Sequence, residues 1–172
     1  QGVDIAIEAF KQVHAEFPNS EFHIYGDGIT IGELKTQANE AGLNGIVRFF
    51  KPRGLREIAK VMANADLGVV PKRADSFGNE AYSTKIMEFM SVGVPVVISS
   101  TKVDRYYFDE SVVRFFESGK ADALAREMLD LLRHPEERQA MAKRAISYAD
   151  ENCWNRRKDD YFEIVDTLCD ER

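Results

Sequence analysis

The chain has 172 residues, of which 44% are hydrophobic and 30% are charged. Its formal net charge of −6 argues against broad nucleic-acid binding, because no basic face dominates. The two cysteines, Cys153 and Cys169, are spaced unlike a metal or redox motif, and no signal or membrane segment is visible. We therefore expect reduced thiols, a cytoplasmic location and one domain with a sizeable core.

Hydrophobic periodicity predicts alternating helices and strands in the first part of the chain. Asp4 can cap a first helix, which Pro18 ends. The predicted helices span about 4–16, 31–41 and 55–64, and the predicted strands span 21–25, 46–50 and 66–71. Such alternation, about every 20 residues, predicts an α/β fold: a doubly wound parallel sheet, Rossmann-like, with helices on both faces.

The pattern changes in the second part of the chain. A polar loop, a helix over 84–92 and strands over 94–99 and 112–116 are followed only by helices, at about 122–132, 135–150 and 154–168. The last helix carries apolar residues at helical spacing, which favours core packing: Trp154, Tyr161, Phe162, Ile164, Val165 and Leu168. No linker or repeat interrupts residues 1–172, so we expect a single domain. No strand precedes the first helix, and we expect the chain to begin within its fold.

The helix over 84–92 is the centre of the functional hypothesis. It is apolar almost all round, which predicts a buried helix, yet Glu88 lies at its middle and would need a hydrogen-bonding partner there. Glu80 lies eight residues earlier, before the helix begins. A helix N-terminus between two carboxylates suits a ligand with a central diphosphate and hydroxyl-rich groups at both ends.

Residues at the start of this helix are candidate phosphate ligands. Ser83 or Thr84 can cap the helix, and free amides in its first turn would face an anion. Lys85 opposes the helix dipole there, which indicates a phosphate partner as much as a lysine reaching into solvent. The oxygens of Glu88 match a ribose cis-diol; the alternative is a structural partner on a neighbouring helix.

Other candidates follow predicted strands, where ligands bind in such sheets. The turn Gly26, Asp27, Gly28 permits close backbone approach, although an ordinary strand-to-helix turn explains it as well. Lys51, Pro52 and Arg53 could offer a stacking surface and main-chain hydrogen bonds for a flat base, and a solvated turn is the alternative.

These residues together resemble a known family. The run EAYSTKIMEFMSVGVPVV, starting at Glu80, resembles the E-x7-E signature of retaining GT-B glycosyltransferases of family four, also called group one. The similarity extends over QGVDIAIEAF, FHIYGDG, GIVRFF and ANADLGVVP, and therefore over nearly the whole chain. It corresponds to the C-terminal, nucleotide-sugar-binding half of these two-domain enzymes.

The resemblance implies a role for each candidate. Glu80 would contact hydroxyls of the donor sugar at the catalytic centre, Glu88 would hold the ribose, and amides around Ser83–Lys85 would hold the diphosphate. Residues near Lys51–Arg53 would meet the base, with the Gly26–Gly28 turn beside the donor. The donor would be a UDP- or GDP-linked sugar and no cofactor or metal is expected. The acceptor, a glycan, lipid or small molecule, would bind the absent N-terminal half, so this domain alone would be inactive. The full-length protein could associate with the inner membrane face. In the family the last helix crosses back to the absent half, which would leave part of its apolar face exposed in this chain.

The chain departs from the family pattern at two places. Gln1 stands where the family has a phosphate-binding lysine, which leaves Lys72, Arg73 and Lys85 as candidate substitutes. The triplet at 76–78 reads SFG but precedes Glu80, whereas the family's SFG follows its first glutamate. Two other hypotheses stay open: a domain that senses nucleotide sugars without transfer, and an unrelated flavodoxin-like or receiver domain. A receiver requires clustered aspartates at its first strand, and none is visible.

Overall fold

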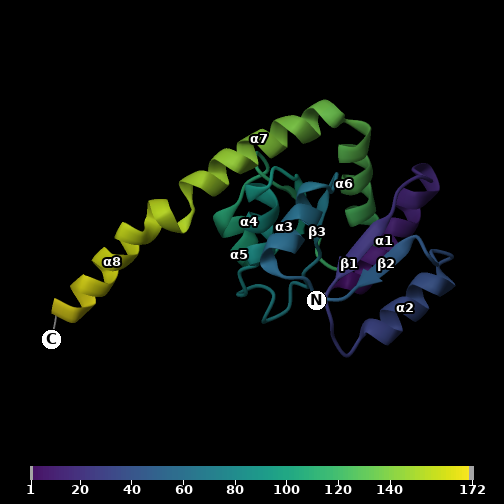
Figure 1. The fold of residues 1–172 in the computed structure, drawn as a ribbon, viewed down its shortest axis with the longest axis horizontal. Helices are drawn as coiled ribbons and strands as arrows, with labels where there is room; N and C mark the ends of the chain where they lie inside the picture. Colours follow the sequence, from purple (N-terminus) through teal and green to yellow (C-terminus); the bar gives the residue numbers. More distant parts are fainter. Residues whose placement is uncertain (1, 171–172) are drawn as a thin grey trace.

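The computed structural model describes residues 2–170 (Figure 1). Its helices are α1 (Val3–Glu16), α2 (Ile31–Glu40), α3 (Leu55–Ala63), α4 (Thr84–Ser91), α5 (Lys102–Tyr107), α6 (Ala121–Arg133), α7 (Pro135–Glu151) and α8 (Trp154–Asp170). Its strands are β1 (Phe22–Tyr25), β2 (Val47–Phe50), β3 (Gly68–Val70), β4 (Val96–Ser99) and β5 (Arg114–Phe116). Each predicted element is present, and its ends lie within a few residues of the predicted ones.

The strands form two hydrogen-bonded groups, and every pairing is parallel. β1 pairs with β2, with Phe22 opposite Val47. β3, β4 and β5 pair in that order, with Val97 of β4 opposite Val69 and Arg114. The predicted parallel α/β class is confirmed, but the described strands do not make one continuous ladder.

Both faces of the sheet are covered, as a doubly wound fold requires. All four residues of β4 are buried, and successive side chains of a strand point to opposite faces. Val97 belongs to a core made with α1, α2 and α6, whereas Val96 and Ile98 belong to a second core made with α4 and α7. The near-continuous apolar sequence of this strand therefore reflects burial on both sides.

Two local predictions are corrected by the structure. Gly2, not Asp4, is the N-cap of α1, in a left-handed conformation that favours glycine, and Asp4 lies in the first turn instead. The segment after β4, for which no helix is predicted, contains the short helix α5, capped by the Thr101 hydroxyl that accepts from the Asp104 amide.

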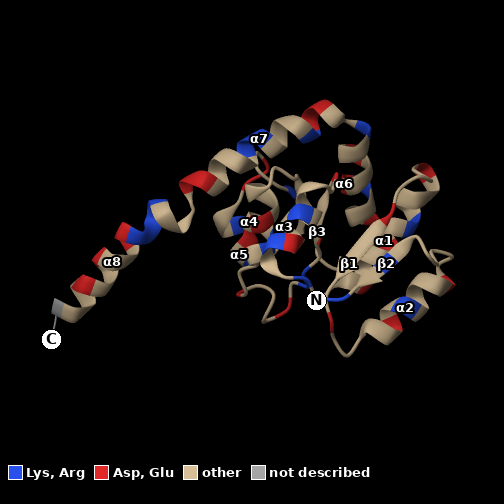
Figure 2. Ribbon diagram, viewed as in Figure 1, with Lys and Arg blue, Asp and Glu red and all other residues tan. Residues whose placement is uncertain are grey.

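The C-terminal helices follow one another across the molecule, and α8 extends away from the remainder of the fold (Figure 1). Five of the six apolar residues named above for α8 are exposed, with Trp154 at 59% and Leu168 at 63% of full exposure, while Val165 is half-buried. Core packing of this face was therefore a wrong prediction for the described chain. α7 and α8 carry both basic and acidic residues, and in α8 the basic ones lie near its start while acidic ones follow (Figure 2).

Candidate functional site

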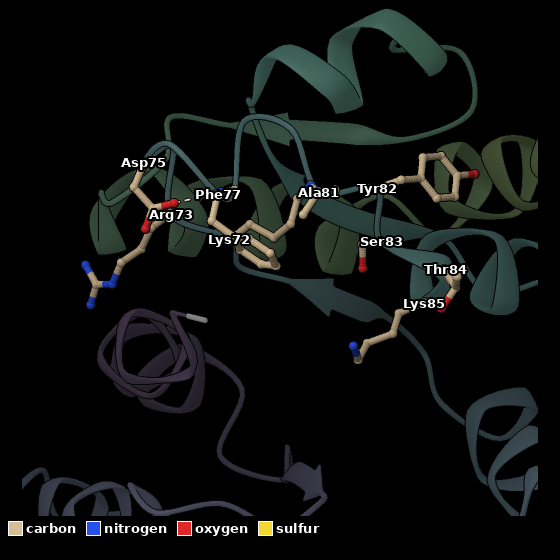
Figure 3. Close-up of a pocket in the computed structure, with 10 residues that line it drawn as sticks. Lys72, Arg73, Asp75, Phe77, Ala81, Tyr82, Ser83, Thr84 and Lys85 are labelled. Carbon is tan, nitrogen blue, oxygen red and sulfur yellow. Dashed lines mark hydrogen bonds between the residues drawn. The ribbon is translucent and has the colours of Figure 1, made fainter.

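A cavity of about 300 Å³ lies where the end of β3, the following loop and the start of α4 meet. Its walls come from a single stretch of sequence, and Figure 3 shows these side chains. They are Lys72, Arg73, Asp75, Phe77, Gly78, Ala81, Tyr82, Ser83, Thr84 and Lys85. The structure thus brings together the predicted residues Ser83, Thr84, Lys85 and Lys72.

The start of α4 supplies anion-binding groups to this cavity. Ser83 is the N-cap residue, and its side chain makes no capping hydrogen bond. The first amides of a helix lack intrahelical acceptors and carry the positive end of the helix dipole. The exposed side chains of Arg73 and Lys85 add two positive charges to the cavity wall. This combination favours a ligand with several negative charges.

The start of α1 lies against the same loop. A Cβ atom added to Gly2, whose φ is +94°, would lie 1.9 Å from the carbonyl oxygen of Pro71, at the end of β3. Arg73 forms an ion pair with Asp4 in the first turn of α1. These contacts explain why glycine is required here, and they place Arg73 between the cavity and α1.

Lys72 is held by protein groups rather than standing free in the cavity. Its side chain is 9% exposed, and its ammonium donates to the Ala81 carbonyl at 2.7 Å and to Asp104 Oδ1 at 2.9 Å. The Asp104 carboxylate is fully buried and also accepts from the Thr101 hydroxyl at 2.8 Å. Sequence reasoning missed Asp104 and Thr101, although the spacing Thr-x-x-Asp is the signal of a helix capping box.

The two signature glutamates lie outside the cavity wall. Glu80 is exposed, and its amide donates to the Phe77 carbonyl at 3.1 Å. Glu88 is half-buried on α4, where only Ile86 and Met90 are fully buried. The expectation of a helix buried all round was therefore wrong. No hydrogen bond or ion pair of the Glu88 carboxylate occurs within residues 2–170, so it needs no internal partner and is available to a ligand.

The remaining predicted residues end β1 and β2, away from the cavity. Gly26 donates its amide to the Phe50 carbonyl at 3.1 Å, so the two turns that follow these strands are neighbours. Asp27 accepts from the amide of Gly28 at 2.8 Å, as in an ordinary turn. The side chains of the other turn, at 51–53, are exposed. The structure therefore joins these two turns to each other but not to the residues at the start of α4.

Tyr82 faces the opposite way from Arg73 and Lys85 (Figure 3). Its ring packs edge-on against Tyr107 of α5, with the centroids 5.0 Å apart. Burial, followed by the nearby tyrosines and Asp104, raises the pKa of Tyr82 to about 12. Its hydroxyl therefore stays protonated at neutral pH.

A second group of polar side chains lies at the corner between α6 and α7. Ligand atoms of Asp130, His134 and Glu137 lie within 4.8 Å of one another. The guanidinium of Arg114, on β5, already pairs with Asp130 at 3.0 Å and with Glu137, and it also lies 3.5 Å from Glu127. These carboxylates are thus already paired with a protein cation, which indicates a structural role for this group.

The sheet is parallel and covered by helices on both faces, and the cavity at the start of α4 lies beyond its strand ends, which is where open α/β domains bind ligands. Residues 1–148 match the family model described as glycosyl transferases group 1. The chain therefore belongs to this family.

Curated relatives support the same assignment. The chain is 30% identical over 135 residues to the amylovoran biosynthesis glycosyltransferase AmsK of Erwinia amylovora. It is also 30% identical over 136 residues to a D-inositol 3-phosphate glycosyltransferase of Saccharomonospora viridis. Each alignment covers 76% of this chain but only 33% and 30% of the respective relative. The chain thus corresponds to about a third of these proteins.

Solved structures share the fold. HepE of Anabaena, crystallised with UDP, matches 96% of this chain and 44% of its own, with a TM-score of 0.80 at 23% identity. The C-terminal domain of the group 1 protein LpcC from Francisella tularensis matches 88% of this chain and 79% of its own, with a TM-score of 0.76 at 16% identity. Across residues 2–170, no helix is both long and apolar enough to cross a membrane.

Proposed function

We propose that the protein carrying this chain transfers a sugar from a nucleotide diphosphate sugar, with retention of the anomeric configuration, and that this chain binds the donor. The observation that carries the proposal is the cavity at the start of α4, with Arg73 and Lys85 beside free helix amides. Such fixed positive groups stabilise the charge that develops on a departing diphosphate. Membership of the group 1 family supports the same chemistry.

In the proposed donor contacts, positively charged groups and amides meet the diphosphate, and carboxylates meet hydroxyl groups. The amides of Ser83–Lys85 take the diphosphate, with Lys85 and Arg73 as the direct cations. Lys72 is buried and bound to Ala81 and Asp104, whereas Arg73 is exposed and only its ion pair with Asp4 competes for it. The Glu88 carboxylate takes the ribose hydroxyls, and exposed Glu80 takes hydroxyls of the donor sugar. Gly26–Gly28 and Lys51–Arg53 lie beside the sugar and the base.

The domain organisation is part of this proposal. β1 pairs with β2 alone and β3 with β4 alone among the described strands, so each keeps one unpaired edge. We propose that a further parallel strand of the full-length protein pairs with the free edges of β1 and β3. We also propose that a second domain binds a glycan, lipid or small-molecule acceptor. On this proposal residues 1–172 are a single donor-binding domain that has no transferase activity alone.

Calorimetry on the full-length protein with UDP, GDP and their sugars tests the donor assignment. HepE was crystallised with UDP and with UDP-glucose, so UDP-glucose is the first ligand to use. We expect saturable binding of at least one nucleotide sugar, and turnover in an acceptor screen that survives a chelator, because the cations of the protein neutralise the diphosphate. The proposal would be refuted if none of these nucleotides and nucleotide sugars bound. Tight binding without turnover of any acceptor would favour the sensing function instead.

A further inference from the structure

The strongest unassigned feature is the buried ion pair between Lys72 and Asp104. Asp104 is 0% exposed and Lys72 is 7% exposed, and the atoms Nζ and Oδ2 are 2.9 Å apart. Burying two charges is costly, and such a pair is weak evidence for stability alone. The partners of this pair indicate another purpose.

One end of the pair is fixed at the start of α5. The Thr101 hydroxyl donates to Asp104 Oδ2 at 2.8 Å and accepts from the Asp104 amide at 3.3 Å. The other end reaches the loop before α4, where the Lys72 ammonium donates to the Ala81 carbonyl at 2.7 Å. The pair therefore connects α5 to the residue that directly follows Glu80.

The residue that precedes Glu80 is also tied to α5. The Val103 amide donates to the Asn79 carbonyl at 3.1 Å, and the Lys102 amide donates to the Asn79 side-chain oxygen at 3.1 Å. Asn79 Nδ2 in turn donates to the Ala74 carbonyl at 3.0 Å. Both chain neighbours of Glu80 are thus held on one short helix, while the Glu80 side chain itself is exposed.

We propose that Lys72 and Asp104 are positioning residues: they tie Ala81 to α5, whose first amides also hold Asn79, and so fix the backbone around Glu80 relative to the start of α4. This inference rests on the proposed function, in which Glu80 contacts the donor sugar and α4 holds the diphosphate. The pair then controls the part of the affinity that depends on the sugar. A misplacement of about 1 Å is enough to cost a large factor in a positioned site.

The double variant Lys72→Met/Asp104→Leu tests the inference in the full-length protein. Replacing both members of a buried ion pair by apolar residues of similar size is often neutral for stability, whereas removing one leaves a buried charge. We expect a melting temperature close to that of the wild type. We also expect the ratio of the dissociation constants for UDP and UDP-glucose to change by about tenfold.

A matched control separates positioning from general weakening. Val13, a residue of α1 that is 1% exposed and packs into the core, lies outside the site, and Val13→Ala should lower the melting temperature while leaving the ratio unchanged. A wild-type ratio in a folded double variant would overturn the inference. If Val13→Ala also changed the ratio of the dissociation constants, the change in the double variant would be explained by loss of stability, and the inference would be overturned as well.

Amide hydrogen exchange gives a readout that needs no ligand. We expect the amides of residues 79–83 to exchange faster in the double variant, with those of α1 unchanged. Unchanged exchange at 79–83 would refute the positioning role even if no nucleotide bound. If exchange at 79–83 rises as expected but the wild type binds no nucleotide, the positioning role of the Lys72–Asp104 pair is supported and the proposed function fails.

Discussion

Glu88 carries the most direct test of the donor site at the scale of one residue. Its carboxylate is half-buried and has no protein partner within residues 2–170, so both oxygens can accept from a ribose. Glu88→Gln turns one acceptor into a donor, and we expect nucleotide affinity to fall by about tenfold, since hydrogen bonds to charged groups contribute about 1.5–3 kcal/mol. Calorimetry with UDP measures this. Glu163→Gln, on exposed α8, is the control, and unchanged affinity in folded Glu88→Gln would contradict the ribose assignment.

Glu80 is expected to act on the sugar rather than on the nucleotide. Its exposed carboxylate lies before the helix that binds the diphosphate. Glu80→Ala should therefore reduce UDP-glucose affinity while UDP affinity stays as it is, because only hydroxyl contacts of the sugar are lost. Parallel titrations with the two ligands check this. The same affinity ratio as in the wild type would show that Glu80 does not touch the sugar.

Gly2 is expected to be irreplaceable for steric reasons. Its φ is +94°, and an added Cβ would meet the Pro71 carbonyl oxygen at 1.9 Å. Left-handed conformation alone costs a residue with a Cβ about 1–2 kcal/mol, so Gly2→Ala should lower the melting temperature by several degrees. Gly32 provides the matched control, because it lies in α2 with nothing within 4 Å of an added Cβ. Gly32→Ala should be neutral or stabilising, and equal losses in both variants would contradict the steric explanation.

At the scale of elements, the packing of α1 against α6 has a pH-dependent component. Arg133 of α6 donates to Glu16 of α1 at 2.6 Å, and this hydrogen bond lowers the pKa of Glu16 below its usual 4.5. A carboxylate with a lower pKa in the folded state stabilises the fold above its unfolded pKa, and this contribution disappears as the pH falls through the folded pKa.

We therefore expect Glu16→Gln to melt below the wild type at pH 6, with the difference shrinking as the pH falls from 5 towards 3. Thermal unfolding followed across this range measures the effect. A difference that stays constant with pH would show that the pair does not contribute through its charge. Glu163→Gln again serves as the control, because exposed α8 lies away from this contact.

A comparison of individual elements shows which features could be predicted from the sequence and which could not. The sequence predicted α4 from its periodicity and its end from Gly93, because a glycine after the last turn is a local signal of a helix end. In the structure Gly93 has a φ of +74°, as such a helix end requires. The sequence could not predict how much of α4 is covered, because burial of Glu88 depends on which elements pack beside it. The pairing of Lys72 with Asp104 joins positions 32 residues apart and has no local signature. Likewise, Asp4 has the chemistry of a cap, but the close approach of Pro71 selected Gly2.

At the scale of the whole molecule, the division of the strands into two groups predicts which strands a further strand would stabilise. β1 and β3 each have an unpaired edge among the described strands, and exposed strand edges are available for further pairing. If a further strand of the full-length protein pairs with these edges, as proposed, we expect the amides of β1 and β3 to be protected from exchange in that protein. Residues 1–172 alone should show fast exchange there. Equal protection in the two proteins would contradict the proposed intervening strand.

Arg114 has a consequence that reaches far from its own position. It joins β5 to carboxylates of both α6 and α7, and so sets the angle of the corner at which α7 begins. The 17 residues of α7 make a rod about 25 Å long, along which a swing of ten degrees becomes about 4 Å. The ion pairs of Arg114 therefore help to hold the direction in which α7 leaves the corner with α6, and with it the position of α8, which carries the exposed aromatic residues.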